Sequence, residues 1–543
     1  MPVSLGVDEK FELTLELPIF IHHTALIYDA MKYKLLLSVL LSLSSLEPAA
    51  RTVTNPVIHG DLPDPSVIRV DSVYYATGTS SEWAPHYPIY RSRDLVNWTH
   101  VGHVFDRKPE WTVSSFWAPE IVAIDGRYFV YYTARRASDS HSYIGVAVAD
   151  RPEGPYTDRG PIVVHGSEAI DAYVFDDGDG RRYISWKAYG LDPRPIELMA
   201  ARLGDDCLST VGEPFTLMRD DEHTLMEGQL MFREGDYYYI LYSIRNCCGF
   251  NSDYAVSVAR SRRVEGPYER CPANPILHGG NDEIKSVGHG TLVTTPEGER
   301  YYLCHAYMEG DDFLCGRQPV IYRMEMGDDL WPRFVGGDDA RVSVTAPAGC
   351  RAQGGVCDFY DGFDSDTLRV DWSWNYPYSD VKAVCRGGRL LLSGRPLTAT
   401  ADGAALCVRP ARPTYSISTR PVGRTSSTQA LTLYGDENYA LIYGMTGHRL
   451  MITLRVNGRE QVLADIAAPV DRPYLCINVE GGLARDFEWS DDGRRWHRIA
   501  LDGLSDETLR SLNRWDRVTR PGLYHFGSPT APAAFDFFRV EYR

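Results

Sequence analysis

Ile121-Val-Ala-Ile-Asp-Gly-Arg-Tyr-Phe129 is the stretch of this sequence that decides its fold. A short apolar run leads into an Asp-Gly turn, and a second run rich in aromatic residues follows, which is the pattern of a tight β-hairpin. Apolar and polar residues alternate on both sides of the turn, and this period of two favours strands over helices. Four other stretches share the pattern: Ser66–Tyr75, Tyr173–Tyr183, Leu230–Tyr238 and Leu292–Tyr301.

These hairpins recur at a nearly constant interval, roughly 50 to 60 residues, along the first part of the chain. A repeat that supplies one small antiparallel sheet at a fixed interval predicts a blade of a β-propeller. Five copies therefore predict a five-bladed propeller over residues 51–345. A β-sandwich built from five long hairpins is the alternative that the hairpins alone leave open.

The pattern of the sequence changes after residues 346–357, which we interpret as a linker. Short alternating strands such as Arg389–Ser393 and Met451–Val456 then follow one another, at a spacing of about 8 to 12 residues. This spacing predicts a second domain over residues 358–543, a β-sandwich of the jelly-roll or concanavalin-like kind, with Ser505–Leu512 as its one short helix. We therefore expect an all-β protein.

Composition supports a β-rich protein and argues against two classes of partner. Of the 543 residues, 44% are hydrophobic and 12% are aromatic, and the formal net charge is −17. Nucleic acids and anionic membrane surfaces attract clusters of lysine and arginine, so we expect neither of them as a partner. Aromatic side chains with exposed flat faces suit the apolar faces of sugars.

Residues 31–50 have the order of a secretory signal peptide. Met31–Lys34 is basic, Leu35–Leu46 is apolar, and small residues precede Arg51. We therefore expect residues 1–30 to be an upstream extension and the mature protein to begin near Arg51. The mature protein is then expected to be secreted or periplasmic, with no membrane attachment. A buried helix is the alternative for the apolar run.

Polar and mostly ionisable side chains recur just before each of the five hairpins, at the start of the innermost strand of each expected blade. In a propeller these positions converge at one end of the central axis. Clustered carboxyl groups push one another's pKa values apart, which places a proton donor beside a proton acceptor. Hydrolysis of a glycosidic bond requires that combination. The residues in phase are Asp64, Glu120, Asp171, Glu227 and His289.

The chain resembles glycoside hydrolase family 43, whose members are five-bladed propellers that act on polysaccharides containing arabinose and xylose. The resemblance covers nearly all of residues 55–340. Five motifs carry it: Pro63-Asp-Pro-Ser66, Ile89–Trp98, Trp117-Ala-Pro-Glu120, Glu227-Gly228, and Gly316-Arg-Gln318 together with Trp331-Pro332.

The resemblance implies a role for each of three carboxyl groups. Asp64 matches the general base that activates water, and Glu227 matches the general acid. Asp171 matches the residue that orients the acid and tunes its pKa, although Ala172 follows it here where the family usually has proline. The family inverts the anomeric configuration, so the resemblance implies a single displacement by a water held between base and acid.

Other matched positions concern substrate and metal. His289 matches a family histidine that stands beside a hydrated calcium ion or replaces it, so the resemblance implies no required cofactor and at most one structural calcium near His289. Arg317 matches an arginine that binds sugar hydroxyls, and Glu120 is a further candidate for substrate binding. Trp83 and Trp117 are candidate stacking platforms for sugars, with packing in the core as the alternative for each.

Two resemblances divide the substrate prediction. Tyr360–Tyr376 is similar to the sandwich domain of family xylosidases and arabinofuranosidases, where this domain can narrow the pocket and favour cleavage of a terminal sugar. Cys247-Cys248-Gly249, followed by Ser252–Ser261, occurs in similar form among endo-arabinanases. We expect an exo-acting α-L-arabinofuranosidase or β-xylosidase with an oligosaccharide or polysaccharide substrate. An endo-1,5-α-L-arabinanase and a non-catalytic carbohydrate-binding propeller are the alternatives.

The adjacent cysteines Cys247 and Cys248 allow two interpretations. In an oxidising compartment they could form a vicinal disulfide. As free thiols they would be two small buried hydrophobic side chains.

Overall fold

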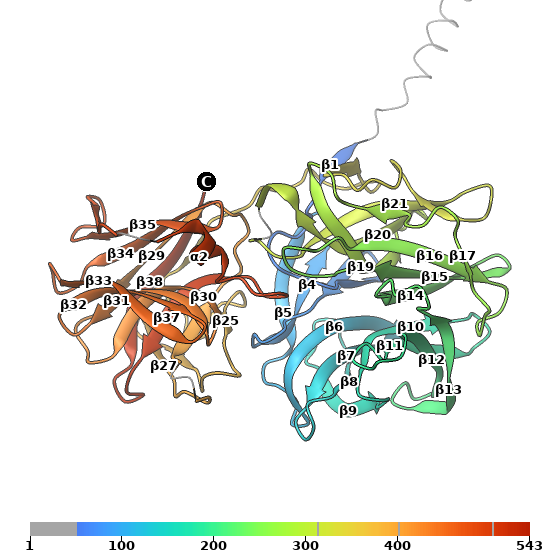
Figure 1. Ribbon diagram of the computed structural model, residues 1–543, viewed down its shortest axis with the longest axis horizontal. Helices are drawn as coiled ribbons and strands as arrows, with labels where there is room; N and C mark the ends of the chain where they lie inside the picture. The colour runs from blue at the N-terminus through green and yellow to red at the C-terminus, as the bar shows by residue number, and fades with distance from the viewer. Residues whose placement is uncertain (1–50, 312–313, 400–401, 502–503) are drawn as a thin grey trace, which may run out of the picture. The chain divides into compact units, whose positions relative to one another are not determined.

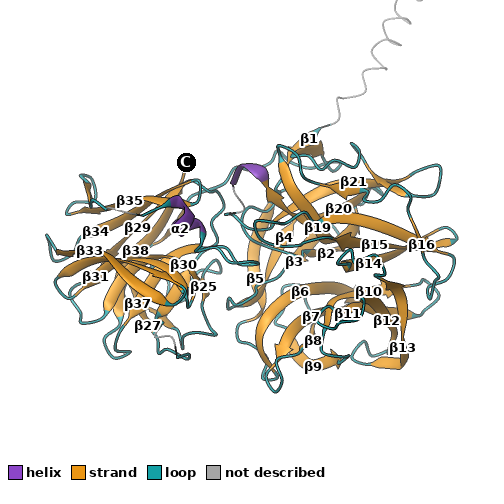
Figure 2. Cartoon of the chain, viewed as in Figure 1, coloured by secondary structure: helices purple, strands orange, loops and turns teal. Residues whose placement is uncertain are grey.

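The computed structural model describes residues 51–543 except 312–313, 400–401 and 502–503 (Figure 1). The expected signal peptide and upstream extension lie outside these described residues. Within them almost every regular element is a strand, and the 3₁₀ helix η1 (Glu309–Asp311) and the helix α2 (Asp506–Arg510) are the exceptions (Figure 2). The prediction of an all-β protein is confirmed. No helix in this part of the chain is long and apolar enough to span a membrane.

Five antiparallel sheets form the blades of a β-propeller, as predicted. Each of the five hairpins supplies the first two strands of one blade, and the outer strands follow in chain order. Blades 1 and 2 are β2 (Ser66–Val70), β3 (Val73–Thr77), β4 (His86–Ser92) and β5 (Trp98–Phe105), then β6 (Thr112–Ile124), β7 (Arg127–Arg136), β8 (Ser142–Ala149) and β9 (Thr157–Val163).

Blades 3 to 5 repeat this arrangement, and blade 4 carries one additional short strand. Blade 3 is β10 (Ala169–Asp176), β11 (Arg182–Ala188), β12 (Glu197–Leu203) and β13 (Thr210–Arg219). Blade 4 is β14 (Glu227–Glu234), β15 (Tyr237–Ile244), β16 (Ala255–Ser261), β17 (Glu269–Arg270) and β18 (Leu277–His278). Blade 5 is β19 (Ile284–Thr294), β20 (Arg300–Met308), β21 (Gln318–Met326) and β22 (Pro332–Phe334).

The segment that precedes blade 1 closes the ring by bonding to blade 5 and the loop after it. The backbone N–H of Asn55 donates to the carbonyl of Val342 (2.7 Å), and that of Val57 donates to the carbonyl of Pro319 (2.9 Å). The side chain of Asn55 also accepts from the N–H of Ile321 (3.0 Å) and donates to its carbonyl (3.2 Å). These bonds join positions more than 250 residues apart, as the separation of 266 between Asn55 and Ile321 shows.

Two sheets form the C-terminal β-sandwich, and apolar side chains such as Leu431, Ile452 and Phe535 fill the space between them. Residues 346–357, the expected linker, contain no strand or helix and connect β23 (Ser343–Thr345) to this domain. One sheet contains β24 (Phe359–Asp361), β26 (Lys382–Cys385), β27 (Leu390–Ser393), β29 (Tyr415–Pro421), β34 (Tyr474–Glu480), β35 (Leu483–Ser490), β36 (His497–Arg498) and β38 (Ala533–Tyr542). The other contains β25 (Ser373–Trp374), β28 (Ala404–Cys407), β30 (Thr428–Asp436), β31 (Tyr439–Thr446), β32 (Arg449–Val456), β33 (Arg459–Ala467) and β37 (Arg520–Phe526).

Helix α2 is shorter than the sequence predicted. Ser505 caps it, because its hydroxyl accepts a hydrogen bond from the backbone N–H of Thr508 (3.2 Å), and Ser511 follows its last turn as the C-cap. Capping residues at both ends therefore restrict the helix to Asp506–Arg510.

Trp83 packs where the propeller meets the sandwich, so the prediction that it offers a stacking face to sugar is wrong. Its side chain is 4% exposed. The Arg520 guanidinium covers its ring at 4.5 Å, and the ring of Tyr434 meets it edge-on at 5.8 Å. The next residue, Ala84, forms a two-residue β-bridge with Trp374 of the sandwich (2.7 and 3.0 Å). Protein atoms thus occupy the space that a sugar would need.

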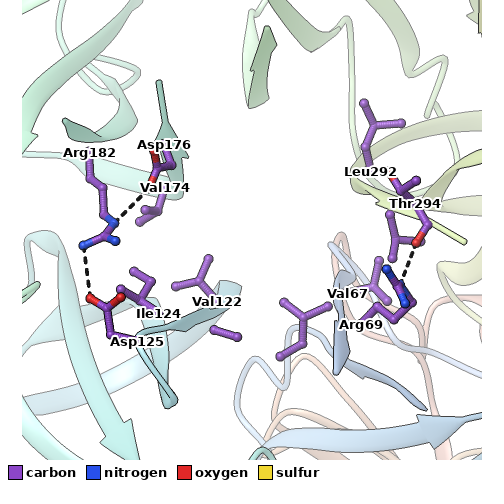
Figure 3. A pocket seen from close by; sticks show the side chains of 13 residues that line it. Val67, Arg69, Val122, Ile124, Asp125, Val174, Asp176, Arg182, Leu292 and Thr294 are labelled. Atoms are coloured by element: carbon purple, nitrogen blue, oxygen red, sulfur yellow. Dashed lines mark hydrogen bonds and ion pairs between the residues drawn. The ribbon is translucent and has the colours of Figure 1, made fainter. Parts of the chain in front are cut away.

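A cavity of about 560 Å³ lies among the far ends of the innermost strands (Figure 3). Its charged groups already pair with one another: Arg182 lies 3.0 Å from Asp176 and 3.6 Å from Asp125. Arg69 donates to the carbonyl of Thr294 (2.9 Å). This end of the strands therefore does not gather the carboxyl groups that the repeat places in phase.

Truncation of the buried indole should destabilise the protein. We expect Trp83→Ala to lower the free energy of unfolding by about 3–5 kcal/mol, the range for removing a buried large aromatic side chain. Urea denaturation followed by fluorescence, with the transitions of the two domains fitted separately, measures this loss. Trp515→Ala is the matched control, because that side chain is 60% exposed and its truncation should change the free energy by about 0.5 kcal/mol or less. A loss below about 1 kcal/mol for Trp83→Ala would contradict its packing.

Candidate active site

The innermost strands begin with an uncommon backbone conformation. A residue at the corresponding position of each blade has a positive φ: 53° at Asp64, 38° at Ala118, 60° at Asp171, 58° at Gly228 and 38° at His289. In blades 2 to 5 this residue falls where the pairing with the second strand shifts register, as in a β-bulge. Bulges re-aim the neighbouring side chains. A positive φ costs a residue other than glycine roughly 1–2 kcal/mol, so the surrounding fold must maintain it.

In two blades the residue at this shared position is not the one that the sequence predicted. Blade 4 has Gly228 there, directly after Glu227, and blade 2 has Ala118 instead of Glu120. The Glu120 side chain is 5% exposed and accepts a hydrogen bond from the hydroxyl of Ser66 (2.5 Å), and burial raises its pKa to about 8. The prediction that Glu120 binds substrate is therefore wrong, because its carboxyl group packs against blade 1 and does not line the cavity.

A cavity of about 280 Å³ lies at the end where the innermost strands begin. Asp64, Asp171 and Glu227 line it from three different blades, and His289 and Arg317 line it from blade 5. The structure thus brings together the three predicted catalytic carboxyl groups and three of the five predicted substrate-binding residues, His289, Arg317 and Trp117.

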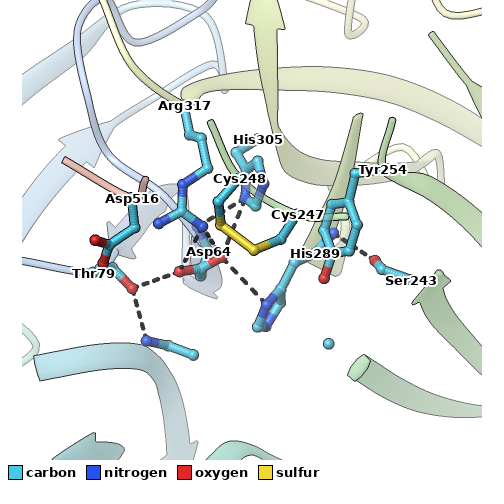
Figure 4. Close-up of polar contacts among 12 residues, drawn as sticks. Asp64, Thr79, Ser243, Cys247, Cys248, Tyr254, His289, His305, Arg317 and Asp516 are labelled. Carbon is cyan, nitrogen blue, oxygen red and sulfur yellow. Dashed lines mark hydrogen bonds and ion pairs between the residues drawn. A yellow bond between two sulfur atoms is a disulfide. The ribbon is translucent and has the colours of Figure 1, made fainter. Parts of the chain in front are cut away.

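Asp64 is surrounded by donors (Figure 4). The hydroxyl of Thr79 donates to its Oδ2 (2.6 Å) and itself accepts from the N–H of Ala118 (2.7 Å). Arg317 Nη1 and His289 Nδ1 lie 3.2 and 3.3 Å from Asp64 Oδ1. Burial alone would raise the pKa of Asp64, but Arg317 and His289 outweigh it and hold this pKa well below its usual range. Asp64 is therefore a carboxylate at neutral pH, as a general base must be.

A second histidine fixes the backbone of the same residue. The N–H of Asp64 donates to His305 Nδ1 (3.0 Å), and the ring of Tyr254 stacks on this histidine at 5.7 Å. Burial lowers the pKa of His305 to about 4, so its neutral ring can accept this bond. The repeat pattern did not identify His305 or Tyr254, because both lie outside the phase of the innermost strands.

Glu227 accepts a hydrogen bond at each carboxylate oxygen. Lys187 Nζ lies 2.7 Å from its Oε2, and the hydroxyl of Tyr254 donates to its Oε1 (3.0 Å). Burial would raise the pKa of Glu227, but Lys187 outweighs burial and lowers it. The opposite holds for Asp171, whose pKa rises to about 6 because of burial, with a further contribution from Glu227. Asp171 Oδ2 also accepts a hydrogen bond from the N–H of Gly228 (3.1 Å). Asp171 is therefore bound to the backbone of the residue that directly follows Glu227.

The residues around His289 form no cluster of direct ligands for the calcium ion that the resemblance allowed. Within the described part of the chain, no three His, Cys, Asp or Glu side chains are grouped to hold a metal. Burial lowers the pKa of His289, but Asp171 and Asp64 outweigh it and raise this pKa to about 9. The imidazolium supplies a positive charge among the carboxylates.

Two walls of the cavity come from segments outside the repeated position that predicted the carboxyl groups. Cys247 and Cys248 are joined by a disulfide and line the cavity (Figure 4). Trp515 and Asp516 reach it from the sandwich domain, from the segment between α2 and β37. Trp117, a predicted stacking platform, also lines the cavity, and its ring meets that of Trp515 edge-on at 6.1 Å.

Polar contacts hold the sandwich segment against the propeller. The hydroxyl of Ser81 donates to Asp516 Oδ2 (3.2 Å), and Arg517 lies 3.4 Å from Glu82. A β-carbon at Gly249 would stand 3.3 Å from the carbonyl oxygen of Trp515, so the chain after the disulfide also approaches this segment closely. The sandwich domain therefore contributes directly to the cavity.

Comparison with known proteins agrees with this geometry. The model of the glycosyl hydrolases family 43 matches residues 53–332. The chain belongs to glycosyl hydrolases family 43. A second model, the beta xylosidase C-terminal concanavalin A-like domain, matches residues 360–541. The predicted concanavalin-like sandwich is thus confirmed.

Three known proteins illustrate the similarity. A xylan 1,3-beta-xylosidase of a Vibrio species is 30% identical over 326 residues, which are 54% of this chain and 60% of that protein. A non-reducing end alpha-L-arabinofuranosidase of Bacteroides ovatus is 28% identical over 389 residues, which are 68% of this chain and 70% of that protein. The GH43 protein BlXynB of Bacillus licheniformis superposes with a TM-score of 0.78 over 91% of this chain and 100% of that chain. Its 24% identity supports the fold alone. The chain spans 60% of the length of the Vibrio relative.

Loss of one hydroxyl should disturb this site measurably. Thr79→Val leaves the N–H of Ala118 without a partner and leaves Asp64 Oδ2 with only Arg317 Nη1 at 3.5 Å, so we expect the free energy of unfolding to fall by about 1–3 kcal/mol. Thr79→Ser keeps the hydroxyl and should lose much less. Urea denaturation of the two variants checks this difference. Equal stability of the valine and serine variants would show that the hydroxyl does not make these two bonds.

Proposed function

We propose that this protein is an inverting glycoside hydrolase that releases terminal arabinofuranose or xylose from plant cell-wall polysaccharides or oligosaccharides such as arabinan, arabinoxylan and xylan. The observation that carries the proposal is that the carboxyl groups of Asp64 and Glu227 face one cavity from different blades. Membership of family 43 supports the same reaction class. The names of the Vibrio and Bacteroides relatives support β-xylosides and α-L-arabinofuranosides as substrates.

The proposed reaction is a single displacement. Asp64, held as a carboxylate, accepts a proton from water while the water oxygen forms a bond to the anomeric carbon. The bond between this carbon and the glycosidic oxygen breaks, and Glu227 gives a proton to the leaving oxygen. Asp171 accepts a hydrogen bond from the N–H of Gly228, next to Glu227. Because its pKa is raised, Asp171 keeps its own proton up to a higher pH than an exposed aspartate does. Arg317 binds Asp64 and offers its guanidinium to the sugar hydroxyls.

The cavity favours removal of a terminal sugar. Trp515 and Asp516 of the sandwich stand at one wall, and Trp117 and the disulfide stand at others, so the site has the walls of a pocket. Cleavage within a chain requires a groove open at both ends. The endo-1,5-α-L-arabinanase alternative keeps the support of the Cys247-Cys248-Gly249 stretch, and product size distinguishes the two. A non-catalytic carbohydrate-binding propeller would have no need of a base and an acid in one cavity.

A substrate screen tests the proposal. The protein is incubated with 4-nitrophenyl β-xyloside, 4-nitrophenyl α-L-arabinofuranoside and linear arabinan. We expect hydrolysis of at least one aryl glycoside, a monosaccharide as the product, and inverted anomeric configuration in the first product seen by NMR. Longer oligosaccharides from arabinan would favour the endo-acting alternative. Absence of hydrolysis with every substrate would favour the binding protein.

The two carboxylates should respond differently to leaving-group quality. We expect Glu227→Gln to impair natural glycosides far more than 4-nitrophenyl glycosides, because a good leaving group needs little protonation. Asp64→Asn removes activation of water, a step common to all substrates, and should depress both by about 10²–10⁴-fold. Values of kcat/KM for the two substrate classes measure this. Leaving-group sensitivity in the Asp64 variant instead would mean that the acid and base assignments are reversed.

Export is part of the proposal, and it depends on residues 31–50. Mass spectrometry of the protein recovered outside the cytoplasm should find an N-terminus near Arg51, since signal peptidase cuts after small residues. Exported protein that retains Leu35–Leu46 would contradict cleavage at this position.

A further inference from the structure

Glu227 is bound in a way that conflicts with the role of an acid. Both of its oxygens accept hydrogen bonds, one from the Lys187 ammonium and one from the Tyr254 hydroxyl. A proton on Oε2 would point at an ammonium group, which has donors and no acceptor. Glu227 can therefore act as an acid from Oε2 once Lys187 has left that oxygen. A buried ammonium without a partner is costly, so Lys187 needs a second acceptor.

A second acceptor is present in the wall of the same cavity. Glu168 lies one residue before β10, and its side chain is 7% exposed. Its Oε2 is buried and has no hydrogen-bond partner among the residues that the structure describes. Glu168 and Lys187 both line the cavity. A buried carboxylate oxygen without a partner is unfavourable, so Glu168 indicates a donor that reaches it in another state of the protein.

Gly190 leaves the space that such a movement requires. A β-carbon at Gly190 would stand 2.3 Å from Glu168 Oε2, 2.9 Å from Lys187 Cε and 3.1 Å from Lys187 Nζ. The unpartnered oxygen and the ammonium therefore border the same small space, which a side chain at residue 190 would fill. Rotation about the terminal bonds of Lys187 can move Nζ within this space while the strand β11 stays in place.

We propose that Glu168 is a positioning residue that takes the Lys187 ammonium from Glu227 when a substrate enters, so that Glu227 can hold the proton that it gives to the leaving oxygen. This inference rests on the proposed function. Lys187 stays protonated and exchanges only its acceptor, from Glu227 Oε2 to Glu168 Oε2. The proton on Glu227 comes from solvent and departs on the leaving sugar. Glu227 is then a carboxylate again and binds Lys187 as before.

The electrostatics of the site agree with this exchange. Among the groups that act against burial at Glu227, Lys187 lowers its pKa most, so moving the ammonium away raises this pKa. Burial lowers the pKa of Lys187, but Glu227 and Glu168 outweigh it, so the amine is charged beside either carboxylate. The groups that face Glu227 are Lys187 on β11, Asp171 on β10, Tyr254 before β16 and His289 on β19.

The test compares Glu168→Gln with the wild type on a series of aryl glycosides of rising leaving-group pKa and on a natural disaccharide. Glutamine keeps the size of the side chain and removes the charge that attracts Lys187. We expect kcat/KM for the disaccharide to fall by at least about 10-fold, and that for 4-nitrophenyl glycosides to change by about 3-fold or less. The alkaline limb of the pH profile of kcat should move to lower pH, because Glu227 keeps Lys187 and loses its proton more readily.

A double variant separates this role from direct contact with the substrate. If Glu168 acts through Lys187, then Glu168→Gln should have no further effect on the leaving-group dependence in a Lys187→Met background. Gly190→Ala provides a second, independent variant, since its β-carbon blocks the space between the two groups and should reproduce the effect of Glu168→Gln. Glu197→Gln is the matched control: this buried glutamate of the same blade pairs with Arg194 (2.5 Å) and does not line the cavity, so the leaving-group dependence should be unchanged.

Two results would overturn the role of Glu168. One is an equal loss with all leaving groups in both Glu168→Gln and Gly190→Ala. The other is an effect of Glu168→Gln that persists without Lys187, which would assign Glu168 to binding of the leaving sugar itself. A wild-type protein that hydrolyses none of the glycosides would overturn the proposed function and this role together. An active wild-type enzyme whose leaving-group dependence is the same in Glu168→Gln would overturn the role of Glu168 alone.

Discussion

Burial of three carboxyl groups around one cavity is the constraint on which the rest of this structure depends. Carboxylates that are removed from water repel one another and need cationic or hydrogen-bonding partners. The propeller supplies these partners from several blades: Arg317 and His289 to Asp64, and Lys187 to Glu227. The partners differ, and therefore the three groups differ in pKa although all are buried. Chemical roles thus follow from which cation each carboxylate meets.

The backbone serves the same constraint. The positive φ values of Asp64, Asp171 and His289 are unfavourable for these residues, and the packed blades maintain the backbone there. The N–H groups of the three residues donate to side chains of other strands, namely His305, Thr133 and Ser243. A regular strand would point successive side chains to opposite faces of its sheet. The bulges in the innermost strands of blades 2 to 5 instead turn side chains toward the axis, where they meet those of the other blades.

Much of the fold and part of the site could be predicted from the sequence, because the repeat is local. Each hairpin shows its strands and turn within about ten residues, so the number of blades and the phase of Asp64, Asp171 and His289 are readable, and Glu227 is misplaced by one residue. Contacts between distant segments are not. Trp83 and Glu120 are residue types that are common in sugar-binding sites. However, Arg520 of the other domain covers Trp83, and Ser66 of another blade binds Glu120.

The residues that the repeat did not reveal share this property. Lys187 lies on a second strand and Trp515 lies in the other domain, so neither is in phase with the hairpins. From the sequence, Lys187 cannot be distinguished from an ordinary polar residue on a strand. Its role follows only from its contact with Glu227 of the next blade. No local pattern around Trp515 predicts that its segment reaches the propeller.

The closure of the ring through Asn55 has a consequence for the synthesis of this protein. Asp64 leaves the ribosome with the first blade, whereas His289 and Arg317, which flank it, belong to the last. The contacts of Asn55 with Ile321 and Val342 likewise join the two ends of the propeller. Until the chain has emerged through Ile321, which follows Asn55 by 266 residues, the first blade has an uncovered edge and its aspartate lacks Arg317. Long-range pairings of this kind form late and leave incomplete chains prone to aggregation. Catalytic competence and protection from aggregation should therefore be acquired together, at the moment when the ring shuts.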